Sequence, residues 1–199
     1  DMGADVKGFK IGDRVTGQCG VGCGRCALCR QGLGNICPDR VEIGVFNRDG
    51  AYAEYLVAPA THAHHLYDLS YQEGALVEPF TVGEWICRRG SISSGDRVGI
   101  IGAGTVGIVA CQMARLHGAE LVVAFGRKPF KLDLARQMGA DETFVLGEQP
   151  LEDAINEVTQ GKGFNVVIEA AGVPEGATLA LRAAAPRARV VITGVFEGE

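Results

Sequence analysis

The 199-residue sequence predicts an α/β fold in which a doubly wound parallel sheet follows a smaller, β-rich unit. From about residue 90 onward, short apolar segments alternate with helical patterns, which is typical of a parallel sheet built from βαβ units. Up to about residue 80, short strand candidates alternate instead with glycine-rich loops. The sequence therefore indicates two domains, residues 1–82 and residues 83–199.

The first domain contains two strand candidates, which are residues 14–17 and residues 51–58. Glycine-rich loops surround both of them, as expected for a small β-rich unit. Three histidines, His62, His64 and His65, follow the second candidate, and we expect them in a solvated loop.

The second domain offers five strand candidates separated by amphipathic helices. Apolar side chains recur at i, i+3, i+4 and i+7 in helical patterns that begin at Val106 and Leu151, and a third pattern begins at the exposed Lys131. A complete doubly wound sheet has a sixth strand, so we expect the sequence to stop inside this domain. The strand candidates are residues 98–101, 121–125, 143–146, 166–168 and 190–193.

Composition and charge favour a small-molecule partner. Hydrophobic residues make up 47% of the chain, which is enough for a packed core. The formal net charge of -5 gives no basic surplus, so we expect no nucleic-acid partner. No apolar run approaches the roughly 20 residues that span a bilayer, and no secretion signal is visible, so we expect no membrane association. Seven cysteines, four of them at a metal-like spacing, fit a reducing cytoplasm better than a disulfide framework.

Four cysteines in the glycine-bearing loop at residues 20–38 form a candidate metal site. They are Cys23, Cys26, Cys29 and Cys37, with the spacing Cys-x2-Cys-x2-Cys-x7-Cys. Four thiolates complete a tetrahedral shell around one zinc ion and leave no position open for substrate, so the spacing predicts a structural zinc site. The alternative is four reduced thiols without metal. Cys19 is either a strand residue or a substitute ligand.

A glycine-rich turn after the first strand of the second domain is a candidate phosphate-binding site. The strand at residues 98–101 runs into Gly-x-Gly-x-x-Gly, formed by Gly102, Gly104 and Gly107, and a helical pattern follows. This arrangement places unpaired backbone N–H groups and the positive end of a helix dipole at one point, which suits a pyrophosphate. The alternative is a purely structural turn, because glycine motifs also occur in plain loops.

Several motifs resemble the zinc-containing medium-chain alcohol dehydrogenases. The cysteine loop lies between Phe-Lys-Ile-Gly-Asp-Arg-Val at residues 9–15 and Asp-Gly-Ala-Tyr-Ala-Glu-Tyr at residues 49–55. Ala-Leu-Val-Glu-Pro-Phe at residues 75–80, Cys-Arg-Arg-Gly at residues 87–90 and the glycine turn resemble the polyol, or sorbitol-type, branch. The resemblance covers essentially the whole chain. It implies a GroES-like catalytic domain over residues 1–82 and a Rossmann-type dinucleotide-binding domain over residues 83–199, both incomplete.

The resemblance also implies a second, catalytic zinc, for which Glu78 matches one ligand position, directly or through a water. Such a zinc lowers the pKa of a bound alcohol, so that the alkoxide transfers hydride to nicotinamide. The family's cysteine ligand and Gly-His-Glu motif are expected upstream of Asp1, so the 199-residue chain alone is not expected to catalyse. From spacing alone, the alternative for Glu78 is an ordinary acid ahead of Pro79 that caps a helix.

Gly126, Arg127 and Lys128, at the end of the second strand, favour NADP over NAD. NAD-binding relatives place an acidic residue there to accept hydrogen bonds from the adenosine ribose, whereas this sequence offers a glycine and two cations. The glycine leaves room for a 2′-phosphate, and the cations pair with it. The alternative is a solvated, basic helix start.

The resemblance assigns further cofactor contacts, for which ordinary core or loop packing is the alternative. Lys131 is expected near the adenosine, and Val106 is expected against the cofactor at the glycine turn. The residues expected beside the nicotinamide are Val82, Thr193, Gly194 and Val195.

Together these features favour a zinc-dependent oxidoreductase that transfers hydride between a secondary alcohol, such as a polyol or related sugar alcohol, and NAD(P). Threonine- and butanediol-type dehydrogenases share much of the pattern. A non-catalytic zinc-binding module and a zinc-independent quinone reductase are two further hypotheses. We expect an alcohol or ketone substrate, a cytoplasmic protein and, from relatives, a homodimer or homotetramer. Phe46 is expected to line the substrate pocket.

Overall fold

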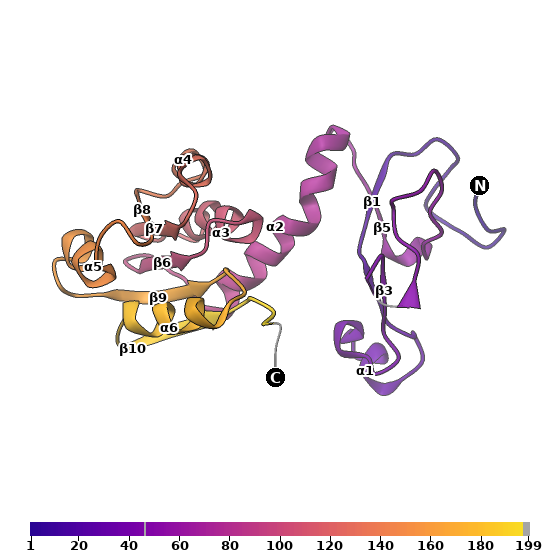
Figure 1. The fold of residues 1–199 in the computed structure, drawn as a ribbon. Helices are drawn as coiled ribbons and strands as arrows, with labels where there is room; N and C mark the ends of the chain where they lie inside the picture. The colour runs from indigo at the N-terminus through magenta and orange to yellow at the C-terminus, as the bar shows by residue number, and fades with distance from the viewer. Residues whose placement is uncertain (46, 197–199) are drawn as a thin grey trace. The chain divides into compact units, whose positions relative to one another are not determined.

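The computed structural model describes residues 1–45 and 47–196, so Phe46 lies outside the described residues. The chain divides into two compact units, Asp1–Glu78 and Pro79–Glu199. Helix α2 (Tyr71–Arg89) runs through the division and contributes residues to both units (Figure 1).

Short strands and helical turns make up the described part of the first unit. β1 (Val15–Gly17) pairs antiparallel with β5 (Ala63–His65). β2 (Gly20–Val21) pairs with β3 (Val41–Ile43), which in turn pairs with β4 (Asn47–Arg48). The helical segments are α1 (Ala27–Arg30) and the 3-10 turns η1 (Gly34–Ile36) and η2 (Ala60–His62). The strand expected at residues 14–17 is confirmed as β1 and begins one residue later.

The predicted strand over residues 51–58 is wrong. These residues form bends followed by extended chain, and no strand within the described residues pairs with them. Tyr52, Tyr55 and Val57 are exposed there. A strand is stable only when a neighbouring strand takes up its backbone hydrogen bonds, and the sequence pattern of the segment does not supply that neighbour.

The histidines that follow are also placed differently from the solvated loop that we expected. His62 ends the turn η2, and His64 and His65 belong to β5. The ring of His65 stacks on that of Phe9 with the centroids 4.5 Å apart, and its Nε2 lies 2.9 Å from the carbonyl oxygen of Gly8. Pairing with β1 therefore makes this segment a strand rather than a loop.

A parallel sheet forms the centre of the second unit (Figure 1). Its strands lie in the order β10-β9-β6-β7-β8. β6, the first of these five along the chain, is in the middle, and the strand order reverses beside it, as in doubly wound Rossmann-type sheets. All five strand predictions are confirmed, although β10 begins six residues earlier than expected. The strands are β6 (Arg97–Ile101), β7 (Leu121–Gly126), β8 (Glu142–Val145), β9 (Phe164–Glu169) and β10 (Ala184–Ile192).

Helices cover both faces of this sheet. The second half of α2 packs on one face with α3 (Thr105–Leu116) and α4 (Pro129–Gln137). α5 (Leu151–Thr159) and α6 (Pro174–Ala183) pack on the other, where Phe125 and Phe164 meet edge to face with ring centroids 6.0 Å apart. The three predicted helices are confirmed as α3, α4 and α5. Among the described residues, no helix is long and apolar enough to cross a membrane.

The sequence analysis missed helices α2 and α6. α2 begins with a capping box, in which the N–H of Ser70 donates to Oε2 of Glu73 over 2.7 Å and the N–H of Glu73 donates to Oγ of Ser70 over 3.2 Å. This Ser-x-x-Glu signal stands in the sequence. Gly74 and Pro79 disfavour a helix directly behind it, and they hide the helical pattern.

Phe164→Ala tests how much the aromatic ring of Phe164 stabilises the second unit. The ring is fully buried, and a Cβ on Gly99 would lie 2.7 Å from its Cδ2, so the neighbouring strand packs directly on it. We expect the substitution to lower the free energy of unfolding by about 3–5 kcal/mol, measured by urea denaturation with circular dichroism. Leu181→Ala, at an exposed position of α6, is the control and should change it by less than about 0.5 kcal/mol. Equal losses in the two variants would contradict this role of the ring.

Candidate metal centre and dinucleotide site

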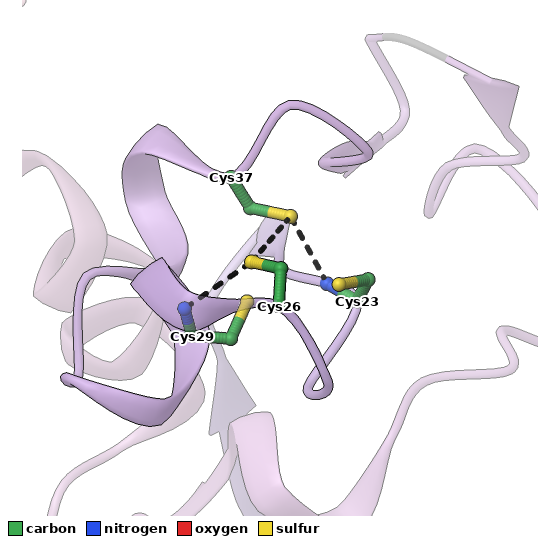
Figure 2. Close-up of side chains that lie close together, drawn as sticks. All are labelled: Cys23, Cys26, Cys29 and Cys37. Carbon is green, nitrogen blue, oxygen red and sulfur yellow. Dashed lines mark hydrogen bonds between the residues drawn. The ribbon is translucent and has the colours of Figure 1, made fainter.

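Four cysteine thiols of the first unit meet around one point (Figure 2). Their Sγ atoms all lie within 4.8 Å of one another, and those of Cys26 and Cys37 are 3.8 Å apart. Cys26 caps the start of α1 and Cys29 lies on it, whereas Cys23 follows β2 and Cys37 follows η1. Three short elements thus bring together the four residues that the spacing singled out.

This arrangement fits a tetrahedral metal ion. With Zn–S bonds of about 2.3 Å, the sulfurs of a tetrahedral site lie about 3.8 Å apart. That value equals the separation of the Cys26 and Cys37 sulfurs. A zinc ion with four sulfur ligands has no open coordination position, so such a site serves the fold rather than catalysis. Within the residues that the structure describes, no other group of three or more metal-ligating side chains is close enough to share an ion.

Backbone N–H groups prepare the thiols for a metal. The N–H of Cys29 donates to Sγ of Cys26 over 3.3 Å, and the N–H of Cys23 donates to Sγ of Cys37 over 3.4 Å (Figure 2). Backbone hydrogen bonds from Arg25 and Cys26 lower the pKa of the Cys23 thiol to about 6. The thiolate is the form that binds metal, so this shift favours binding at Cys23. At Cys29 a backbone hydrogen bond from Gly24 is outweighed by burial and by hydrogen bonds with the neighbouring thiols, which raise its pKa to about 12.

The remaining cysteines stand apart from this cluster. Cys19 lies in a bend between β1 and β2, where its carbonyl oxygen accepts the N–H of Ile43 over 2.9 Å, so it is neither a strand residue nor a member of the cluster. Burial raises the pKa of both Cys87 and Cys111 to about 12. These two are thiols in the core of the second unit.

Glu78 lies exposed in the middle of α2. The alternative in which it caps a helix is therefore wrong, because α2 continues for two turns or more on either side. Among the described residues, Glu78 belongs to no group of three or more metal-ligating side chains. Its assignment to a catalytic zinc stays a prediction.

The glycine turn joins β6 to α3 at the carboxyl edge of the sheet. Gly102 has a φ of +110°, and a Cβ there would lie 2.7 Å from the carbonyl carbon of Ala170, so the position requires glycine. A Cβ on Gly107 would overlap the carbonyl oxygen of Gly102. At Gly104, which caps the start of α3, a Cβ would meet no atom of the described chain within 4 Å. The turn is thus crowded at its first and third glycines and open at the second, where a phosphate would approach the helix N-terminus.

A cavity of about 180 Å³ lies between this turn and the ends of the neighbouring strands. Gly102 and Ala103 line it from β6, Gly126 and Arg127 line it from β7, and Ala171 lines it from the loop after β9. The other lining residues are Ile101, Leu146, Val173, Glu175, Gly176 and Leu179. The predicted phosphate turn and the predicted adenosine end of the site therefore share one cavity.

Two exposed cations follow the end of β7. Gly126 is the buried last residue of the strand, and a Cβ there would lie 2.9 Å from the side chain of Ala103. Arg127 and Lys128 are exposed, and Lys128 caps the start of α4. Lys131, in the first turn of α4, is half-buried.

Three of the four residues predicted beside the nicotinamide follow β10, and the fourth, Val82, lies on α2. Thr193 donates twice to the carbonyl oxygen of Glu169, from its N–H over 3.0 Å and from its Oγ1 over 2.7 Å. Val195 is exposed. Val82 and Val106 are partly buried against the core on the α3 side of the sheet. No described contact tests the cofactor roles of these residues, which stay predictions.

Glu169 was missed by the sequence analysis. It ends β9 with its side chain fully buried. Its Oε1 accepts the N–H groups of Ala171 and Gly172 over 2.8 and 2.9 Å, and its Oε2 accepts the N–H of Gly194 over 3.2 Å. The signal in the sequence was an acid directly after a fully apolar strand core, followed three residues later by a glycine.

The purified chain is expected to bind about one zinc ion through the cysteine cluster. Cys37→Ser removes a buried ligand and should weaken zinc binding by about 100-fold, because structural zinc sites gain roughly 3 kcal/mol from each ligand. Competition with a chromogenic chelator measures the affinity. Cys19→Ser is the control and should bind zinc as the unchanged chain does. Equal zinc affinities for the two variants would contradict the assignment of Cys37.

Two protein families match successive parts of the chain. Residues 1–68 match the alcohol dehydrogenase GroES-like domain, and residues 105–199 match the zinc-binding dehydrogenase family. L-threonine 3-dehydrogenase of Pseudoalteromonas translucida is 40% identical over 176 residues, which are 87% of this chain and 51% of that protein. Sorbitol dehydrogenase of Bacillus subtilis is 34% identical over 195 residues, which are 98% of this chain and 55% of that protein. The chain thus spans about half the length of the curated relatives it matches.

Solved structures of dehydrogenases also resemble the chain. A protein described as a zinc-binding dehydrogenase from Sinorhizobium meliloti 1021, bound to NADP, is 34% identical with a TM-score of 0.89, and the match covers 100% of this chain and 59% of that one. Galactitol-1-phosphate dehydrogenase from Escherichia coli is 32% identical with a TM-score of 0.89, over 99% of this chain and 57% of that one. With both family matches in their expected order and these relatives beside them, the chain belongs to the zinc-containing medium-chain alcohol dehydrogenases.

Proposed function

We propose that the chain serves hydride transfer between a secondary alcohol and a nicotinamide dinucleotide, as part of a zinc-dependent dehydrogenase. The observation that carries this proposal is the cavity shared by the glycine turn and the cationic end of β7. A turn with open space at Gly104 receives the pyrophosphate at the start of α3, and the neighbouring strand end receives the adenosine ribose. A structural protein would have no need of this combination.

NADP is the proposed dinucleotide. Arg127 and Lys128 are exposed cations next to the cavity, and Gly126 stands where a carboxylate would repel a 2′-phosphate. The relative from Sinorhizobium meliloti is bound to NADP and is 34% identical, which supports the same cofactor here. Glu175, which also lines the cavity, lies in the first turn of α6 and not at the end of β7.

Glu78 is the proposed contribution of this chain to a catalytic zinc. When bound, such a zinc acts as a Lewis acid that lowers the pKa of an alcohol so that it can release hydride. Glu78 is an exposed carboxylate, a suitable oxygen ligand, on a helix that holds it at a fixed position. The resemblance assigns the other ligands to a cysteine and a Gly-His-Glu motif that this 199-residue sequence does not contain.

The proposed substrate is a polyol or related sugar alcohol, and L-threonine is the second candidate. Sorbitol dehydrogenase of Bacillus subtilis and galactitol-1-phosphate dehydrogenase of Escherichia coli favour the first. The 40% identity to an L-threonine 3-dehydrogenase favours the second. Oxidation of a secondary hydroxyl group is common to both candidates.

Gly104→Ala tests the phosphate site without disturbing the fold. Its backbone, with φ of -80° and ψ of -176°, suits alanine, and the new methyl group meets open space within the described chain. We expect an unchanged melting temperature and an affinity for both NADPH and NADH lowered by at least about 10-fold, because the methyl group occupies the place of the phosphate. Titration of the dinucleotide fluorescence measures both affinities. Unaltered binding in a folded variant would rule out this turn as the phosphate site.

Arg127→Ala tests the preference for NADP. Loss of a charge-assisted hydrogen bond worth about 1.5–3 kcal/mol should weaken NADPH binding by roughly 10-fold to 100-fold. NADH lacks the 2′-phosphate, so its affinity should change by less than about 2-fold. Lys162→Ala removes an exposed cation outside the cavity and is the matched control. If the unchanged chain binds NADH as tightly as NADPH, the preference is wrong.

A further inference from the structure

Glu169 is a fully buried carboxylate at the carboxyl end of β9. A fully buried carboxylate loses its hydration, at a cost of several kcal/mol before compensation. Three backbone N–H groups and the N-terminal turn of α6 offset this cost; a Cβ on Gly176 of that turn would lie 2.5 Å from Oε1. No cation pairs with Glu169 within residues 1–45 and 47–196. An apolar side chain of similar shape would leave these three N–H groups without an acceptor, so the carboxylate is the group on which both loop segments converge.

The carboxylate lies where the nicotinamide half of the dinucleotide must pass. The strand order places β7 on one side of β6 and β9 and β10 on the other. If the pyrophosphate sits at the end of β6 and the adenosine at the end of β7, the other half of the molecule extends over the ends of β9 and β10. Glu169 joins the segments that follow these two strands, since it binds Gly172 after β9 and Gly194 after β10.

We infer that Glu169 is a positioning residue, which holds residues 193–195 in place beside the nicotinamide ring; this inference rests on the proposed function. Three contacts tie that segment to the end of β9, because Gly194 donates to the carboxylate and Thr193 donates twice to the carbonyl oxygen of Glu169. The loop after β9 packs in turn on Gly102, where a Cβ would lie 2.7 Å from the nitrogen of Ala171. Glu169 thereby sets the nicotinamide segment relative to the phosphate turn.

Glu169→Gln separates the two contacts of the carboxylate, one with the loop after β9 and one with Gly194. Oε1 accepts two N–H groups and Oε2 accepts one. A glutamine has one acceptor oxygen, and it keeps more hydrogen bonds when this oxygen faces Ala171 and Gly172. Its NH2 group then faces the N–H of Gly194, so donor meets donor. The substitution should displace the segment from Gly194 onward, while Thr193 stays bonded to the backbone carbonyl oxygen of residue 169 and the loop after β9 stays in place.

The experiment compares two ligands that differ only at the nicotinamide end. NADPH and 2′-phospho-ADP-ribose share the adenosine, the 2′-phosphate and the pyrophosphate, and their affinities for the purified chain are measured by calorimetry. Glu169→Gln should weaken NADPH binding by at least about 10-fold and change 2′-phospho-ADP-ribose binding by less than about 2-fold. The fluorescence of bound NADPH should shift toward that of free NADPH. If the unchanged chain binds NADH more tightly, NADH and ADP-ribose serve as the pair.

Asp96→Asn is the control, because Asp96 is also a buried carboxylate that accepts a backbone N–H, from Ser93 over 3.0 Å, and it lies at the opposite edge of the sheet, directly before β6. Unlike Glu169, it also pairs with a cation, Arg189 of β10, over 2.6 Å. Asp96→Asn should lower the melting temperature and leave the ratio of the two affinities unchanged. If Glu169→Gln does not fold, Gly194→Ala replaces it, since its Cβ would lie 2.4 Å from the Cα of Gly172 and 2.5 Å from Oε2 of Glu169 and so move the segment away from both.

Three outcomes overturn the inference. Unchanged NADPH binding in Glu169→Gln, or an equal loss of both ligands, shows that the carboxylate has no particular relation to the nicotinamide end. The same result in Gly194→Ala, where that variant replaces Glu169→Gln, has the same meaning. Failure of the unchanged chain to bind either ligand overturns the proposed function first, and the inference with it.

Discussion

Direct contact between the backbones that follow β6 and β9 is the constraint on which the dinucleotide-binding unit depends. The N–H of Ala170 donates to the carbonyl oxygen of Ile101 over 2.8 Å, and Gly102 then turns away in a conformation that favours glycine. The N–H of Gly102 continues the ladder toward β7 by donating to Phe125 over 2.8 Å. The peptide bond between Ile101 and Gly102 therefore forms hydrogen bonds to the chain on both sides of β6, and the glycine turn begins there. Its position is set by the hydrogen bonds of the sheet itself.

The first unit relies on a different kind of constraint. Its strands are two or three residues long, and few of its described side chains are fully buried. A fold with so small a core needs a further source of stability, which four thiolates around one metal ion would provide. Gly22 allows Sγ of Cys29 to approach the backbone closely, because a Cβ at residue 22 would lie 2.7 Å from that sulfur. The cysteine spacing would thus compensate for the small core of the first unit.

The sequence was most informative where structure depends on local patterns. Strands β6 to β10 and helices α3 to α5 follow from apolar periodicity, and the cysteine cluster follows from spacing, because each depends on residues close together in the chain. The segment at residues 51–58 has the composition of a strand, but a strand also needs a partner, and no strand among the described residues pairs with it. Helix α2 was hidden by Pro79, and Glu169 was hidden because its partners, Gly172 and Gly194, meet only after folding.

Helix α2 also limits how independently the two units can fold. Its 19 residues divide at the unit boundary into eight before Pro79 and eleven from Pro79 onward. The capping box lies in the first part. Ile86 and Cys87 of the second part are buried in the core between the sheet and the helices on this face. Isolated helices shorter than about 12–15 residues are marginal in water, so a protease cut at this boundary would leave each product with a helix end that its own length cannot sustain. The shared helix thereby links the folding cooperativity of the first unit to that of the second.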